Sequence, residues 1–125
     1  MNKAKILLVD DEADFREVMG ATIRMWGYDL IEASTGKEAI GVLTDKNPQI
    51  IILDYMMPEM DGVTTLKEIR KFDKTVPVIM FTAHPDIKTI KGTEKLGISA
   101  FIPKLSTFSD VSASLKTTIE MIINK

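Results

Sequence analysis

Short apolar runs recur along the chain, and each is followed by a polar residue at or just beyond its carboxyl end. The runs cover residues 6–9, 50–53, 76–81 and 98–102. Runs of this length, bounded by prolines and polar residues, are typical of strands buried on both faces of a parallel sheet. Residues 28–33 alternate apolar and polar side chains instead, which predicts a less buried strand near an edge.

Between these runs the apolar residues change to a helical spacing. Residues 15–26 carry a stripe at intervals of three and four, with Asp11 as the expected N-cap and Gly27 as the stop. Thr35 and Glu38 have capping-box spacing and open a short helix. Further helices are predicted over residues 63–70, 87–96 and 111–122, the last one capped from Thr107.

The resulting order is strand then helix, repeated five times. Helical segments between parallel strands require right-handed crossovers. The pattern therefore predicts an α/β fold: a doubly wound five-stranded parallel sheet, most simply in strand order 2-1-3-4-5. Residues 1–125 form one domain, because no linker or low-complexity segment divides them.

Composition limits the possible functions. The 125 residues are 45% hydrophobic, carry a net charge of −2 and include no cysteine. Disulfides and thiolate chemistry are excluded, and the charge balance gives no argument for direct nucleic-acid or membrane binding. No apolar run approaches the roughly 18–20 residues of a membrane-spanning helix, and the first apolar run is too short for a signal peptide. A cytoplasmic protein is expected.

Parallel strands place their carboxyl ends at one edge of the sheet, so the polar residues that follow them should converge. These residues are Asp10, Asp11, Asp54, Thr82 and Lys104. Each alone has an ordinary explanation as a helix cap, a turn residue or a solvated lysine. Together, clustered carboxylates need a cation, and hard oxygen ligands without histidine or cysteine suit Mg²⁺. With a lysine and a hydroxyl nearby, the set predicts a phosphoryl-transfer site in which a carboxylate can be the nucleophile.

Four segments carry a resemblance to a known family. They are residues 6–12, 54–62, 81–83 and 101–104. The sequence resembles the receiver domain of bacterial two-component response regulators over its whole length. That family has a flavodoxin-like fold of the topology predicted above.

The resemblance implies a role for each residue at the sheet edge. Asp54 is the phosphoacceptor. Asp10 and Asp11 hold Mg²⁺ directly or through water, and the backbone carbonyl of Met56 completes the protein ligands. Lys104 pairs with the phosphoryl oxygens.

The resemblance also implies a switch. Thr82 donates to the phosphoryl group after phosphorylation, and Phe101 occupies the family's aromatic switch position, where it turns inward when Thr82 moves. Phe101 lacks the hydroxyl of the tyrosine often found there, so packing is its only means of action. His84 and Met56, each two residues beyond a site residue, are expected to set the rate of dephosphorylation.

The implied partners are a sensor histidine kinase or a histidine phosphotransfer protein as phosphoryl donor, and an unidentified downstream protein. The signal is expected to leave through the face of the fourth helix, fifth strand and fifth helix. There Lys88, Lys91 and Lys95 form a basic stripe that is either a solvated face or a dock for an acidic surface. The protein is expected to be a monomer or a phosphorylation-dependent dimer, and a stand-alone receiver rather than an excised one.

One position departs from the family pattern. Leu105 follows Lys104 where the family usually has proline after a cis bond. A cis bond before a non-proline residue costs about 2.5–4 kcal/mol, so a trans bond is expected.

Two other functions use related chemistry. A Mg²⁺-dependent aspartyl-phosphate phosphatase of the haloacid-dehalogenase type needs an acid/base aspartate two residues after its nucleophile, and here that residue is Met56. A flavin mononucleotide binder needs a hydroxyl- and glycine-rich loop after the first strand, where this chain has the acidic residues 11–14. The sequence therefore favours a signalling switch whose only chemistry is on its own Asp54.

Overall fold

A computed structural model describes residues 4–57, 59–83, 87–104 and 107–124. Strands and helices alternate along the whole of this chain. In order they are β1 (Lys5–Val9), α1 (Ala13–Met25), β2 (Asp29–Ala33), α2 (Gly36–Lys46), β3 (Ile50–Asp54), α3 (Gly62–Phe72), β4 (Val78–Thr82), α4 (Ile87–Glu94), β5 (Ala100–Pro103) and α5 (Phe108–Ile123).

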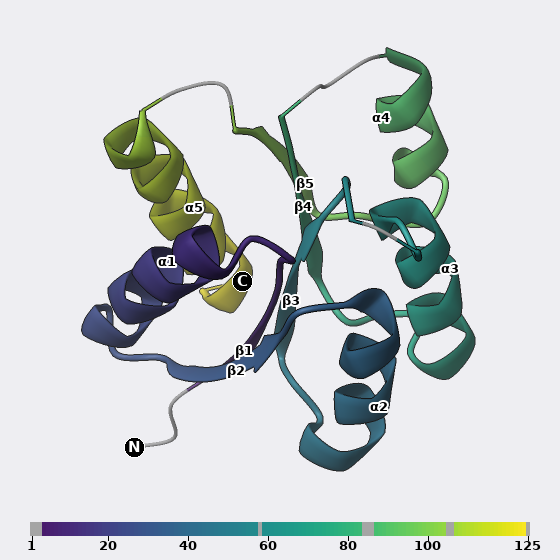
Figure 1. Ribbon diagram of the computed structural model, residues 1–125, viewed down its shortest axis with the longest axis horizontal. Helices are drawn as coiled ribbons and strands as arrows, with labels where there is room; N and C mark the ends of the chain where they lie inside the picture. The colour runs from purple at the N-terminus through teal and green to yellow at the C-terminus, as the bar shows by residue number, and fades with distance from the viewer. Residues whose placement is uncertain (1–3, 58, 84–86, 105–106, 125) are drawn as a thin grey trace.

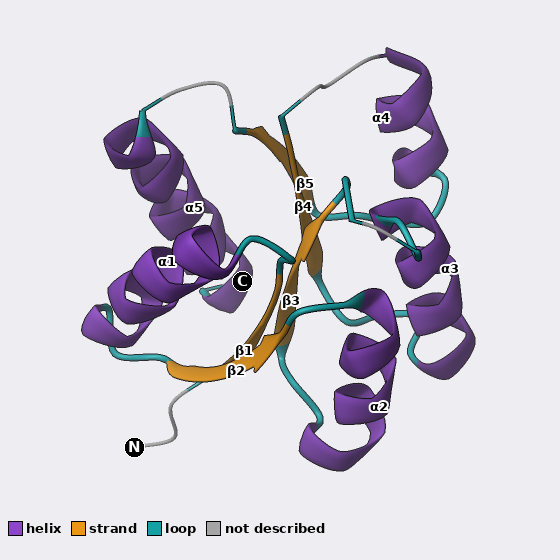
Figure 2. Ribbon diagram, viewed as in Figure 1, coloured by secondary structure: helices purple, strands orange, loops and turns teal. Residues whose placement is uncertain are grey.

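The five strands form one parallel sheet in the order β2-β1-β3-β4-β5. Helices α1 and α5 cover one face, and α2, α3 and α4 cover the other (Figure 1, Figure 2). The predicted flavodoxin-like topology is confirmed. The order reverses between β1 and β3, so the loops after these two strands diverge to opposite faces and leave a crevice at the sheet edge.

The core has two apolar layers, one on each face of the sheet. In β3, Ile50 and Ile52 pack toward α1 and α5, whereas Ile51 and Leu53 pack toward α2 and α3. All four side chains are fully buried. This two-sided burial is the reason why the strand has no polar alternation. The strand predicted near an edge, β2, is indeed an edge strand and keeps polar residues facing solvent.

Helix caps confirm two predictions and correct one. Thr35 and Thr107 cap α2 and α5 by accepting hydrogen bonds from the backbone N–H groups of Glu38 and Asp110. The prediction of Asp11 as the cap of α1 is wrong, because Glu12 holds that position. The Glu12 N–H donates to the Asp10 carboxylate at 2.9 Å, which keeps these residues in a turn ahead of the helix.

Proline sets where β4 begins. The sequence predicted a strand from residue 76, but β4 starts at Val78 because Pro77 has no N–H to give to the sheet. Its carbonyl still accepts a hydrogen bond from Ile51 at 2.9 Å. The strand consequently stays aligned with β3, and Phe81 lies opposite Asp54.

Candidate functional site: an acidic pocket at the sheet edge

Three neighbouring strands bring the site residues together. Asp54 ends β3, Thr82 ends β4, and Lys104 follows β5 directly. In the sheet register Thr82 lies opposite Pro103, and the Lys104 N–H donates to the Thr82 carbonyl at 2.6 Å. Asp10 follows β1, and its N–H donates to the Ala33 carbonyl at 3.1 Å. Asp10, Asp54 and Thr82 are all buried, as expected for residues at the floor of a crevice.

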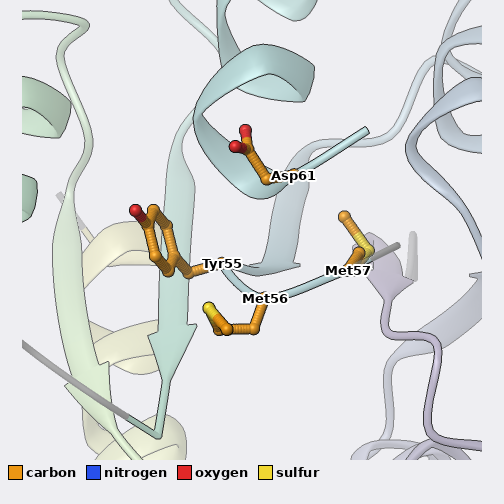
Figure 3. Close-up of a pocket in the computed structure, with 4 residues that line it drawn as sticks. All are labelled: Tyr55, Met56, Met57 and Asp61. Carbon is orange, nitrogen blue, oxygen red and sulfur yellow. The ribbon is translucent and has the colours of Figure 1, made fainter. Parts of the chain in front are cut away.

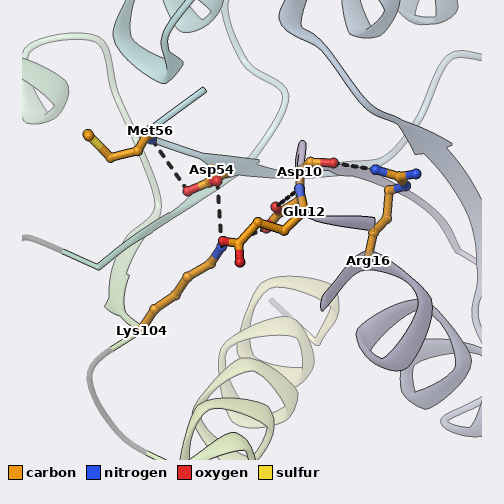
Figure 4. Close-up of polar contacts among 6 residues, drawn as sticks. All are labelled: Asp10, Glu12, Arg16, Asp54, Met56 and Lys104. Atoms are coloured by element: carbon orange, nitrogen blue, oxygen red, sulfur yellow. Dashed lines mark hydrogen bonds and ion pairs between the residues drawn. The ribbon is translucent and has the colours of Figure 1, made fainter. Parts of the chain in front are cut away.

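Lys104 crosses this crevice to reach the carboxylates (Figure 4). Its ammonium nitrogen lies 2.7 Å from Oδ2 of Asp10, 3.5 Å from Oδ2 of Asp54 and 3.4 Å from Oε1 of Glu12. The Lys104 side chain is only 10% exposed. The sequence prediction that Asp10, Asp54 and Lys104 meet at the sheet edge is thus supported by contacts between side chains up to 94 residues apart.

Three carboxylates in this pocket are close enough to share a cation. One oxygen each from Asp10, Glu12 and Asp54 lies within 4.8 Å of the others. Glu12 takes a place that the sequence assigned to Asp11, whose side chain is exposed and stands outside this group. Glu12 was missed, although its position two residues after Asp10 was a usable signal. An all-oxygen donor set of this kind fits Mg²⁺.

Electrostatics support the same fit. Burial raises the pKa of Asp54 to about 7, the negative charges of Asp10 and Asp11 add to the effect, and Lys104 opposes it. Burial also raises the pKa of Asp10. Burial of Lys104 disfavours its charged form, yet the hydrogen bond with Asp10 and the nearby carboxylates raise the pKa of Lys104 above its usual value. One ammonium does not neutralise the pocket, so a divalent cation would relieve the remaining repulsion.

Arg16 fixes the backbone beside Asp10. Its guanidinium donates to the Asp10 carbonyl at 2.6 Å and lies 3.5 Å from the Glu32 carboxylate on β2. Sequence reasoning missed this residue, because it lies on α1 among ordinary solvent-facing positions. The contact ties the first turn of α1 to the end of β1 and holds the Asp10 carboxylate toward Asp54 (Figure 4).

The loop after β3 forms the other wall of the site. Met56 is 54% exposed, and its N–H lies 3.4 Å from Oδ1 of Asp54. Together with Tyr55, Met57 and Asp61 it lines an open hollow of roughly 490 Å³ (Figure 3). Gly62 closes this loop, and a Cβ there would lie 2.6 Å from the Asp54 carbonyl oxygen. The close approach explains why glycine follows Asp61 at the start of α3.

The remaining predicted residues lie farther from the carboxylates or outside the description. Phe101 on β5 is half-buried against the layer that faces α2 and α3. The backbones of Lys91 and Lys95 lie at the end of α4, with exposed side chains. His84, the side chain of Lys88 and the Lys104–Leu105 peptide bond lie outside the described residues. The predicted roles of these positions stay predictions.

The fold and the acidic pocket define a doubly wound α/β protein with its reactive groups at the carboxyl ends of the strands. The model of the response regulator receiver domain family matches residues 6–116. The chain therefore belongs to the response regulator receiver domain family of two-component systems.

Individual relatives agree with this assignment. A probable transcriptional regulator, ycf27, of Porphyridium aerugineum is 36% identical over 98% of this chain and 50% of its own length. The transcriptional regulatory protein ZraR of Escherichia coli is 31% identical over 91% of this chain and 26% of its own length. The chain thus spans half the length, or less, of these relatives.

Solved structures show the same fold. The chemotaxis protein CheY4 of Vibrio cholerae superposes with a TM-score of 0.88 at 25% identity, covering 97% of this chain and 99% of that one. A LuxR-family two-component response regulator from Aurantimonas superposes with a TM-score of 0.87 at 29% identity, covering 98% and 86%. Among the described residues, no helix is both long and apolar enough to span a membrane.

Proposed function

We propose that this protein is a phosphorylation-controlled signalling switch in which Asp54 accepts the phosphoryl group. The observation that carries the proposal is the position of the Asp54 carboxylate. It is 3% exposed at the end of β3, with the Lys104 ammonium 3.5 Å away and Asp10 in the same carboxylate cluster. A nucleophile, an acidic pair and a counter-charge at one strand edge are what phosphoryl transfer to a carboxylate needs.

The transfer itself makes one bond and breaks one. An Asp54 carboxylate oxygen attacks the phosphorus of a phosphohistidine, a new O–P bond forms, and the P–N bond breaks with its electron pair returning to the donor imidazole. Asp10, Asp54, Asp11 or Glu12, and the Met56 carbonyl are the groups that would hold Mg²⁺, which supplies neutralisation of the phosphoryl oxygens when bound. Lys104 supplies a second positive charge from the β5 side.

The phosphoryl group then changes which contacts are favourable. It adds about −1.5 to −2 charge and three acceptor oxygens next to Lys104 and the end of β4. Thr82 and Lys104 move toward these oxygens, and Phe101 moves inward from its half-buried position. The change shifts a pre-existing equilibrium toward the active arrangement and is read at the surface of α4, β5 and α5.

The proposal includes the partners. A sensor histidine kinase or a histidine phosphotransfer protein supplies the phosphoryl group in the cytoplasm, and a downstream protein binds the α4–β5–α5 surface. A phosphatase for external substrates is not part of the proposal. The residue two positions after Asp54 is Met56, and a thioether does not transfer protons.

The test is phosphorylation by acetyl phosphate with Mg²⁺, followed by intact mass. The expected result is the addition of one phosphoryl group that Asp54→Ala or removal of Mg²⁺ by a chelator abolishes. The matched control is Asp14→Ala on the exposed side of α1, which should be phosphorylated like the parent. A phosphoryl group that survives Asp54→Ala, or one that forms equally well in the chelator, would contradict the proposal.

A further inference from the structure

Three phenylalanines from different elements surround the stem and head of Lys104. The ring centroid of Phe15 lies 4.2 Å from the Lys104 ammonium nitrogen. Phe81 meets the Phe15 ring edge-on, with centroids 5.9 Å apart and planes at 89°. Phe108, the first residue of α5, meets it at 6.4 Å and 72°. The distance and the orientation of the Lys104–Phe15 pair are those of a cation–π contact.

The position of the Phe15 ring is fixed from the phosphoacceptor side. Phe81 is fully buried in β4 and lies opposite Asp54 in the sheet register. Its edge-on contact with Phe15 is a favourable aromatic geometry. The face of the Phe15 ring is therefore held at a set place relative to Asp54, even though Phe15 itself belongs to α1.

Lys104 needs such a restraint because space is open beside it. A hollow of roughly 320 Å³ lies next to its side chain, lined in part by Phe15 and Phe108. A lysine side chain has many rotamers, and the hollow gives them room. The Asp10 hydrogen bond at 2.7 Å holds the ammonium while the protein is unphosphorylated, but this bond must loosen when the ammonium turns to the phosphoryl group.

We propose that Phe15 is a positioning residue that keeps the Lys104 ammonium at the phosphoacceptor while its hydrogen-bond partner changes from Asp10 to a phosphoryl oxygen. The inference rests on the proposed function of Asp54. A ring face attracts the ammonium without using its N–H groups, so the same contact persists in both states. Asp54 is already 3.5 Å from the nitrogen, and the required movement is small.

The test separates the ring from its volume. Phe15→Leu keeps an apolar side chain and removes the ring face, Phe15→Tyr keeps the ring, and Phe108→Leu makes the same exchange at the neighbouring ring. With acetyl phosphate and saturating Mg²⁺, Phe15→Leu should slow the phosphorylation of Asp54 about three- to tenfold, the size expected for a cation–π contact. Phe15→Tyr and Phe108→Leu should stay within about twofold of the parent.

A double-mutant cycle with Lys104→Gln tests the coupling without phosphorylation. In the parent background Phe15→Leu should change the unfolding equilibrium constant about three- to tenfold more than it does in the Lys104→Gln background. Absence of this coupling, or equal slowing by Phe15→Leu and Phe108→Leu, would overturn the positioning role. Failure of the proposed function would appear differently, as a parent protein that takes no phosphoryl group while the stability coupling remains.

Discussion

Lys104 pairs with Asp10 more closely than with the phosphoacceptor. The nitrogen-to-oxygen distance is 2.7 Å to Asp10 and 3.5 Å to Asp54. Before phosphorylation the lysine therefore mainly neutralises a carboxylate that is also a candidate metal ligand. The same side chain that would bind the phosphoryl group competes with Mg²⁺ for the pocket, and both consequences can be measured.

Replacing Lys104 by glutamine should weaken the protein and strengthen its metal binding. Asp10 and Asp54 would face each other without a counter-charge, which should lower the free energy of unfolding in chelator by about 2–4 kcal/mol. Loss of the competing ammonium should tighten Mg²⁺ binding several-fold. Urea denaturation and calorimetric titration measure the two effects. The exposed Lys116→Gln on α5 is the control, and unchanged Mg²⁺ affinity in Lys104→Gln would show that the two cations do not compete.

Removing the Asp54 charge should stabilise the metal-free protein at neutral and higher pH. Near pH 4 and below, the carboxyl is protonated in both states and contributes nothing. As the pH rises toward the folded-state pKa of about 7, the unfolded chain releases its proton first, so the free energy of unfolding falls.

Asp54→Asn should consequently be about 1–3 kcal/mol more stable than the parent at pH 8 without metal, and should differ much less at pH 4. Denaturant titrations at both pH values in chelator measure the difference. The exposed Asp14→Asn serves as control. A parent that is as stable at pH 8 as Asp54→Asn would contradict a raised pKa at Asp54.

The two acidic residues after Asp10 should differ in metal binding. Asp11 is the ligand expected from the family pattern, whereas Glu12 belongs to the carboxylate cluster but has a side chain that is 65% exposed. We expect Asp11→Asn to weaken Mg²⁺ binding about tenfold and Glu12→Gln less than about threefold, because the longer exposed side chain loses more freedom when it is ordered. Calorimetric titration at pH 8 compares them. The reverse order would assign the ligand to Glu12.

The close approach at Gly62 predicts a large effect from one methyl group. In Gly62→Ala the new Cβ would lie 2.6 Å from the Asp54 carbonyl oxygen and 2.7 Å from Tyr55 Cα, so the backbone beside the phosphoacceptor must shift. The expected loss in the free energy of unfolding is about 2–4 kcal/mol, together with slower phosphorylation. Gly41→Ala within α2 is the matched control. Nothing lies within 4 Å of its Cβ, and it should stabilise the protein by about 0.5–1 kcal/mol.

The sequence by itself determined the fold and the edge at which the site lies. Apolar runs without polar alternation, such as residues 50–53, require burial on both faces, and helical segments between them leave a parallel sheet as the consistent solution. In a parallel sheet all carboxyl ends share one edge. That physical constraint is why Asp10, Asp54 and Lys104 were expected together before any side chain was placed.

Only the tertiary structure decided which side chains touch. The preference of Lys104 for Asp10, the entry of Glu12 into the carboxylate cluster and the ring of Phe15 beside the ammonium depend on strand register and on rotamers in a shared space. These contacts join residues up to 94 positions apart, so no local pattern encodes them. The raised pKa of Asp54 belongs to the same class, because burial and neighbouring charge act through space and not along the chain.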